Sequence, residues 1–79
     1  MDEKQRKIEE IEREIEFLNV NMKSKRFDRF PKSEQLRYIN EQIKLWNKLK
    51  ELAGFFDKMK INAGLVVLEE LKKKIEKEN

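Results

Sequence analysis

Basic and aromatic residues are interleaved between residues 23 and 38, a pattern that suits an anion carrying an aromatic ring. Residues 23–32 contain five basic residues and one acidic residue, a net charge of +4 in a chain whose total is +3. Guanidinium groups bind phosphate in a bidentate geometry, and aromatic rings stack on nucleobases. We therefore predict a site for a nucleotide-like anion that consists of Lys23, Lys25, Arg26, Arg29, Phe30, Arg37 and Tyr38.

A second interpretation of the same segment stays open. Phe27 and Phe30 would then only close the end of a helical hairpin, while the lysine and arginine side chains would be solvated. Both interpretations place this segment in the connection between two helices, because Pro31 disfavours helix at Phe30 and Ser33 with Glu34 is a helix start signal.

The catalytic inventory is short, because the chain contains no cysteine and no histidine. Neither a nucleophile–histidine pair nor a zinc site with the usual ligands can therefore form. The two glycines do not stand in a phosphate-binding loop motif. Carboxylates are expected mainly on the exposed side of a helix, at Glu9, Glu10, Glu12, Glu14 and Glu16. We predict no enzymatic activity, no metal and no cofactor.

Apolar residues at spacings of 3 and 4 indicate helices rather than strands. In the first segment these residues are Ile8, Ile11, Ile15, Leu18 and Met22, which predicts a helix over residues 3–22. After the connection the same spacing continues through Leu36, Ile39, Ile43, Trp46, Leu49, Ala53, Phe56 and Met59. The period crosses Gly54 without a jump, so we predict one long helix over 33–61 that forms an antiparallel hairpin with the first.

A change of phase follows near Asn62, Ala63 and Gly64. At 100° per residue, the stripe from Ile61 to Ile75 lies roughly 150° from the stripe that ends at Met59. A straight helix would place the two stripes on nearly opposite faces. We therefore predict a break near Gly64 and a shorter third helix over 65–77, in a single all-α domain covering residues 1–79.

The apolar surface is broader than an isolated hairpin needs, which favours assembly into a homo-oligomer. The residues expected at the interface between subunits are Trp46, Phe55 and Phe56. The N-terminal sequence is charged from its second residue, and the longest apolar run has six residues against the roughly 20 needed to span a bilayer. We expect a cytoplasmic protein without a membrane partner.

The order of these features resembles a group of small phage-encoded helical hairpin proteins. The resemblance covers about residues 5–60 and is carried by Phe17-Leu18, Phe27, Phe30-Pro31, Ser33-Glu34-Gln35, Gln42 and Trp46. Some members of that group are sponges that sequester the cyclic oligonucleotide signals of bacterial anti-phage systems such as CBASS, as homo-oligomers with sites between subunits. The resemblance implies that Lys23, Lys25, Arg26 and Arg29 contact phosphates and that Phe30 or Tyr38 stacks on a base. The third helix has no counterpart in that pattern.

Three functional hypotheses follow. The first is a phage-type protein that captures a cyclic oligonucleotide as a homo-oligomer and so counters host defence, acting in the host cytoplasm. The second is a helical protein–protein interaction module or an inhibitor of a host protein. The third is binding of DNA or RNA, which ranks lower because the basic charge is gathered in one short connection rather than spread along a helix face.

Overall fold

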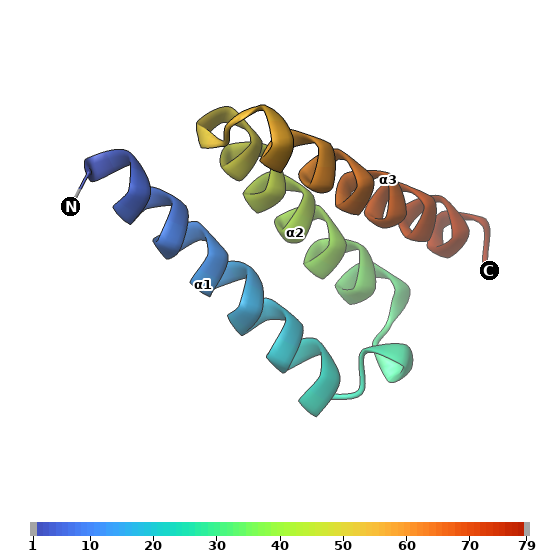
Figure 1. The fold of residues 1–79 in the computed structure, drawn as a ribbon. Coiled ribbons are helices and arrows are strands. Elements are labelled where there is room, and N and C mark those ends of the chain that lie inside the picture. Colours follow the sequence, from blue (N-terminus) through green and yellow to red (C-terminus); the bar gives the residue numbers. More distant parts are fainter. Residues whose placement is uncertain (1, 79) are drawn as a thin grey trace.

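Three helices lying side by side make up the molecule (Figure 1). The computed structural model describes residues 2–78 and, within them, all side chains except those of Phe55 and Phe56. Its helices are α1 (Glu3–Ser24), α2 (Lys32–Leu52) and α3 (Phe55–Lys77), and a 3-10 turn, η1 (Phe27–Arg29), joins α1 to α2. Successive helices run antiparallel with α2 in the middle, which confirms the predicted all-α class and its hairpin.

The first helix begins and packs as its sequence predicts. The Asp2 carboxylate accepts a hydrogen bond from the Lys4 backbone N–H at 3.2 Å, so an unpaired donor of the first turn is satisfied. Along the helix, the 3–4 spacing places one apolar stripe toward α2. Ile15 is buried in the core, and Ile8, Ile11 and Leu18 are half-buried against it.

The three helices form a curved single layer rather than a triangular bundle. Three helices packed side by side would span roughly 21–25 Å, given axes about 8–10 Å apart and a Cα radius of about 2.3 Å. The second-largest extent of the Cα trace is 22 Å, and the smallest is 14 Å. One side of α2 is exposed and polar, whereas its other side is covered by α1 and α3 over the buried Gln42 and Leu49. We refer to these two sides as the convex and the concave face.

The chain reverses at Ala53 and Gly54, so the predicted helix over 33–61 and the predicted break near Gly64 are wrong. Both residues are extended, with ψ of 154° and 176°. Met59, which continued the apolar spacing of α2, is 61% exposed. The earlier reversal is favoured because it leaves α3 with 23 residues, enough to cover the 21 residues of α2 along their whole length. A third helix over 65–77 would have covered only about three fifths of α2 at 1.5 Å per residue.

The second glycine, Gly64, lies inside α3 and serves packing rather than turning. The six-membered ring of Trp46 lies against it, and a Cβ atom at Gly64 would meet two ring carbons at 3.3 Å. A glycine in a helix costs about 1 kcal/mol relative to alanine. Here its missing side chain gives room to the largest residue of α2, in the core that also contains Leu45, Leu49 and Leu65.

A buried amide joins the same tryptophan to α1. Gln42 is 3% exposed, and its Nε2 donates to Asn19 Oδ1 and lies 3.4 Å from the Met22 sulfur. Its Oε1 accepts a hydrogen bond from the Trp46 indole N–H at 3.4 Å. Because a buried polar group without partners costs about 1–3 kcal/mol, this network fixes the register of α1 against α2.

At one end of the layer, a lysine side chain links the start of α2 to the end of α3. The Lys32 ammonium, at the start of α2, donates to the carbonyls of Glu76 and Glu78 at 2.9 and 2.8 Å. These carbonyls lie at the C-terminal end of α3, where a cation also complements the helix dipole. Across residues 2–78 we find no helix whose length and apolar content would suit a membrane crossing.

Substitution of Gly64 tests the packing of α2 on α3. We expect Gly64→Val to lower the free energy of unfolding by about 1–3 kcal/mol, because the added methyl groups collide with the Trp46 ring. The gain in helix propensity, about 0.3 kcal/mol or slightly more, is too small to compensate. Urea unfolding followed by circular dichroism measures the change.

Gly54→Ala is the matched control. Gly54 has ordinary negative φ, and no atom lies within 4 Å of the position that a Cβ would take. Because Gly54 is the N-cap residue of α3, where glycine is preferred to alanine, we expect this variant to lose about 1 kcal/mol or less. Equal destabilisation by both variants would contradict the packing role of Gly64.

Candidate functional site

The predicted basic residues lie together at one end of the layer. Lys23 is in the last turn of α1 and Lys25 follows that helix directly, while Arg26 and Arg29 flank and end the η1 turn. All four side chains are exposed. Among residues 2–78, the ion pair that forms is between Arg37 and Glu34, so none of these four is paired with a carboxylate there.

Arg26 has the one positive φ among the described non-glycine residues, at 56°. This left-handed conformation costs a residue with a Cβ roughly 1–2 kcal/mol, and glycine would adopt it freely. It starts the turn in which the backbone N–H of Arg29 donates to the Arg26 carbonyl at 2.9 Å. Because strained backbone positions cluster at functional sites, the Arg26 side chain is a candidate for a role in binding.

The aromatic residues of the connection form a row that leads into α2. The rings of Phe27 and Phe30 lie edge to face with their centres 5.8 Å apart. The rings of Phe30 and Tyr38 are tilted relative to each other, with their centres 5.4 Å apart. The Arg37 guanidinium carbon lies 5.5 Å from the centre of the Tyr38 ring. Gln35 Nε2 donates to the Phe27 carbonyl at 3.0 Å and so fixes η1 against α2. The structure thus brings Phe30, Arg37 and Tyr38 together.

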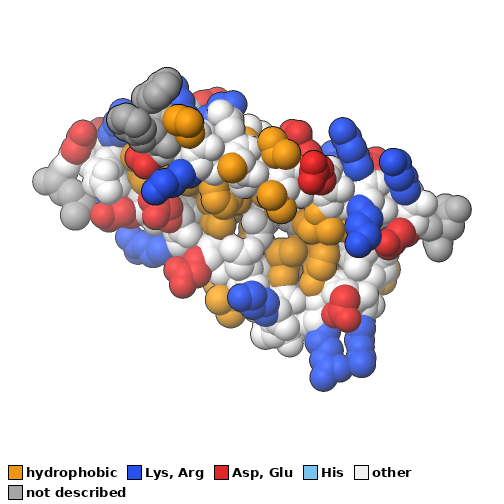
Figure 2. Space-filling view, turned by 45° about the vertical axis from the view of Figure 1, so that its right-hand side comes forward, with side chains coloured by type: hydrophobic (Ala, Val, Ile, Leu, Met, Phe, Trp, Pro, Cys, Tyr) orange, Lys and Arg blue, Asp and Glu red, His pale blue; other side chains and the backbone are white. Residues whose placement is uncertain are grey.

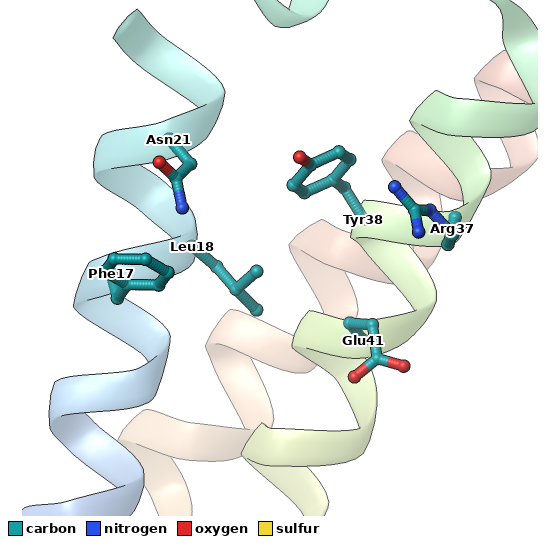
Figure 3. A pocket seen from close by; sticks show the side chains of 6 residues that line it. All are labelled: Phe17, Leu18, Asn21, Arg37, Tyr38 and Glu41. Carbon is teal, nitrogen blue, oxygen red and sulfur yellow. The ribbon is translucent and has the colours of Figure 1, made fainter. Parts of the chain in front are cut away.

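The row ends in an open groove between α1 and α2, which we name the α1–α2 groove (Figure 3). Its volume is about 300 Å³, and its lining residues are Phe17, Leu18, Asn21, Arg37, Tyr38 and Glu41. Leu18 points toward α2, and the Tyr38 hydroxyl points toward α1. Glu41 and Arg37 supply opposite charges on the α2 side. The groove therefore combines apolar walls with a donor, an acceptor and an aromatic face.

Four lining residues were not among the predicted site residues, namely Phe17, Leu18, Asn21 and Glu41. Phe17 carried a signal, because it is a large aromatic residue outside the apolar stripe of α1. It is 67% exposed. No feature of the sequence marked Asn21 or Glu41, since their place in the groove depends on which turn of α1 faces which turn of α2.

The groove and the basic cluster are neighbours in space. Lys25 lies one turn beyond Asn21, and its backbone N–H donates to the Asn21 carbonyl at 3.0 Å. On the other side, Tyr38 lines the groove and contacts Phe30 of the connection. The predicted residues Lys23, Lys25, Arg26 and Arg29 do not line the groove themselves, whereas Arg37 and Tyr38 do.

The residues predicted at a subunit interface lie away from this groove. Trp46 of α2 is half-buried, with its six-membered ring against Gly64 of α3. The same residue lines a second groove, on the concave face. The side chains of Phe55 and Phe56 lie outside the described part of the chain. Within that part, no group of three or more acidic side chains is arranged to hold a metal ion.

Replacing Arg26 separates the strain of the turn from the charge. We expect Arg26→Gly to raise the free energy of unfolding by up to about 1 kcal/mol, because glycine accepts the left-handed conformation. Arg26→Ala keeps the strain and should change stability by less than about 0.5 kcal/mol. Thermal unfolding of the two variants gives the comparison, and a destabilised Arg26→Gly would show that the side chain itself supports the fold.

Comparison with protein-family models, with curated proteins and with solved structures yields no match to this chain. The chain is a small three-helix protein with a basic connection and an aromatic groove between the same two helices.

Proposed function

We propose that this protein is a non-enzymatic binder of a small, anionic, nucleotide-like ligand, which it sequesters as a homo-oligomer. The ligand class that suits it best is a cyclic oligonucleotide of the kind used as a signal in bacterial defence. A phage-encoded protein that captured such a signal would counter host defence. The resemblance of residues 5–60 to phage helical hairpin proteins suggests this biological setting.

The observation that carries the proposal is an aromatic groove between α1 and α2 at the end of the layer where the basic connection joins these two helices. A nucleotide has a flat apolar ring and a phosphate, which need different partners a short distance apart. The α1–α2 groove offers Phe17 and Tyr38 to the ring. The connection next to it offers Lys25, Arg26 and Arg29 to the phosphate.

The groove has polar groups for selecting a base. The Glu41 carboxylate accepts hydrogen bonds and would suit an N–H group on the edge of a base. The Asn21 amide both donates and accepts. Arg37 already binds Glu34 at 2.7 Å, but its guanidinium has five N–H donors and keeps several for a ligand. A purely apolar ligand would leave these groups without partners, which disfavours it.

The distribution of charge favours a small ligand over a nucleic acid polymer. A polymer needs phosphate contacts along an extended track, and its affinity falls steeply with salt. Here the net charge of +4 is confined to residues 23–32, at one end of a layer 46 Å long. The exposed side of α2 carries both signs, with Glu41 and Glu51 beside Lys44 and Lys48.

Titration calorimetry against a panel of cyclic di- and trinucleotides tests the proposal. We expect one member to bind with a dissociation constant in the micromolar range or below. Tyr38→Ala should weaken it by roughly 5- to 150-fold, the range expected when stacking worth about 1–3 kcal/mol is lost. Arg26→Gly should weaken it as well, without straining the turn.

Lys58→Ala is the matched control, because this exposed lysine near the start of α3 lies at the other end of the layer. It should leave affinity unchanged. The absence of heat with every nucleotide at tens of micromolar, or binding that ignores Arg26 and Tyr38, would reject the proposed ligand.

A second candidate function, a protein-interaction module, is favoured by an apolar strip on α3. Met59, Val66 and Val67 are 61%, 53% and 64% exposed and lie away from α2. Such a strip suits the apolar face of a partner helix. We expect Val67→Glu to abolish capture of a stoichiometric protein partner if this is the function, whereas charge reversal within residues 23–32 should not affect it.

A further inference from the structure

A single layer of helices leaves its core covered on one side only. Domains usually bury their apolar surface between two packed layers. In the described residues of this protein, seven apolar side chains are buried. Others that face the core stay half-exposed, among them Ile8, Trp46 and Ala53. Figure 2 shows hydrophobic side chains along the middle of one face, between charged side chains.

The concave face is hollowed by a continuous groove between α1 and α3, which we name the concave groove. Two depressions of about 190 and 290 Å³ share Glu12 and Leu49 and so join end to end. They are lined by Ile8, Glu12, Ile15, Glu16, Asn19, Trp46, Leu49, Ala53, Asp57, Lys60 and Ile61. From Ile8 to Asn19 the groove follows about 16 Å of helix α1, at 1.5 Å per residue. Its floor is apolar and its edges are charged.

The two edges differ in charge. The α1 edge carries two carboxylates, Glu12 and Glu16, one turn apart and both exposed. The α3 edge carries Lys60, with Asp57 one turn earlier. Glu12 and Lys60 line the same part of the groove, at the level of Leu49 and Ala53, but they do not form an ion pair within the chain.

We propose that the concave groove binds a second copy of this chain, face to face, about a two-fold axis parallel to the helices. That axis turns one layer over onto the other without shifting it along its length. The α1 helix of each copy therefore lies over α3 of its partner. Glu12 and Glu16 then meet the partner's Lys60, twice in the dimer, and the two layers enclose the apolar floors between them.

A second copy fits this surface better than an unrelated helix. A two-fold interface must be complementary to itself. The two carboxylates of the α1 edge would face Lys60 on the partner's α3 edge, while Asp57 lies one turn away from that contact. The result is a six-helix, two-layer core of the kind that one chain lacks. This inference rests on the self-association in the proposed function and names its surface. The α1–α2 groove lies on the other side of the seam formed by Ile15 and Met22, so the dimer leaves it open.

Paired charge reversals test the arrangement through a complementary mixture. A chain with Glu12→Lys and Glu16→Lys should dimerise at least roughly tenfold more weakly than the wild type, because lysines then face lysine. A chain with Lys60→Glu should also weaken, because carboxylates face each other. An equimolar mixture should recover the dimer, since both contacts of the heterodimer then join opposite charges. Sedimentation velocity measures each mass against the 9.7 kDa chain.

Asn62→Lys is the control, because Asn62 is exposed on α3 and lines neither depression of the groove. It should leave the dimer intact, and circular dichroism should show all variants folded. A wild-type protein that stays monomeric up to millimolar concentration would overturn the proposal. So would reversals that weaken the dimer without recovery in the mixture, or a dimer that Asn62→Lys disrupts and the reversals do not.

A measurement on the wild-type chain covers the case of a variant that fails to fold. A carbodiimide joins a carboxylate to a neighbouring amine, so a mixture of ¹⁴N and ¹⁵N protein identifies links between chains by mass. We expect Glu12–Lys60 links between differently labelled copies. Links confined to single chains would overturn the dimer. Because none of these readouts involves a ligand, failure here and failure of nucleotide binding are separate results.

Discussion

The close approach of Trp46 to Gly64 is the contact on which the rest of the structure depends. It lets the largest side chain of α2 fit against the backbone of α3, so that the core residues Leu45, Leu49 and Leu65 can meet. The same indole donates to Gln42, whose amide reaches Asn19 on α1. One residue of the middle helix therefore sets the position of both outer helices.

The curved layer gives the molecule two different faces. On the convex side, α2 is polar, and the seam with α1 opens into a groove with a tyrosine and a phenylalanine at its walls. On the concave side, the apolar floor is flanked by carboxylates on α1 and a lysine on α3. The proposed ligand site and the proposed dimer surface therefore lie on different faces, so occupation of one would not block the other.

The sequence predicted α1 and the start of α2 well, but it placed the reversal between α2 and α3 near Gly64 instead of at Ala53 and Gly54. The 3–4 spacing located α1 and most of α2, and it also showed that the stripe from Ile61 to Ile75 is out of phase with the earlier one. Spacing alone could not locate the reversal, because both glycines lie near the change and Met59 continues the earlier stripe. The reversal is decided by how much of α2 the last helix covers. The basic connection was visible as charge, but the α1–α2 groove depends on helix register and was not.

The position of Trp46 has a practical consequence for following this protein in solution. It is the single tryptophan of the chain, and its ring lies between α2 and α3 while its N–H is bonded to a residue that also contacts α1. Its fluorescence therefore reports on the seam between α2 and α3 without any label. Detachment of α3 would change that emission, whereas events at the distant basic connection would leave it nearly constant. The chain carries a built-in optical probe of its own assembly.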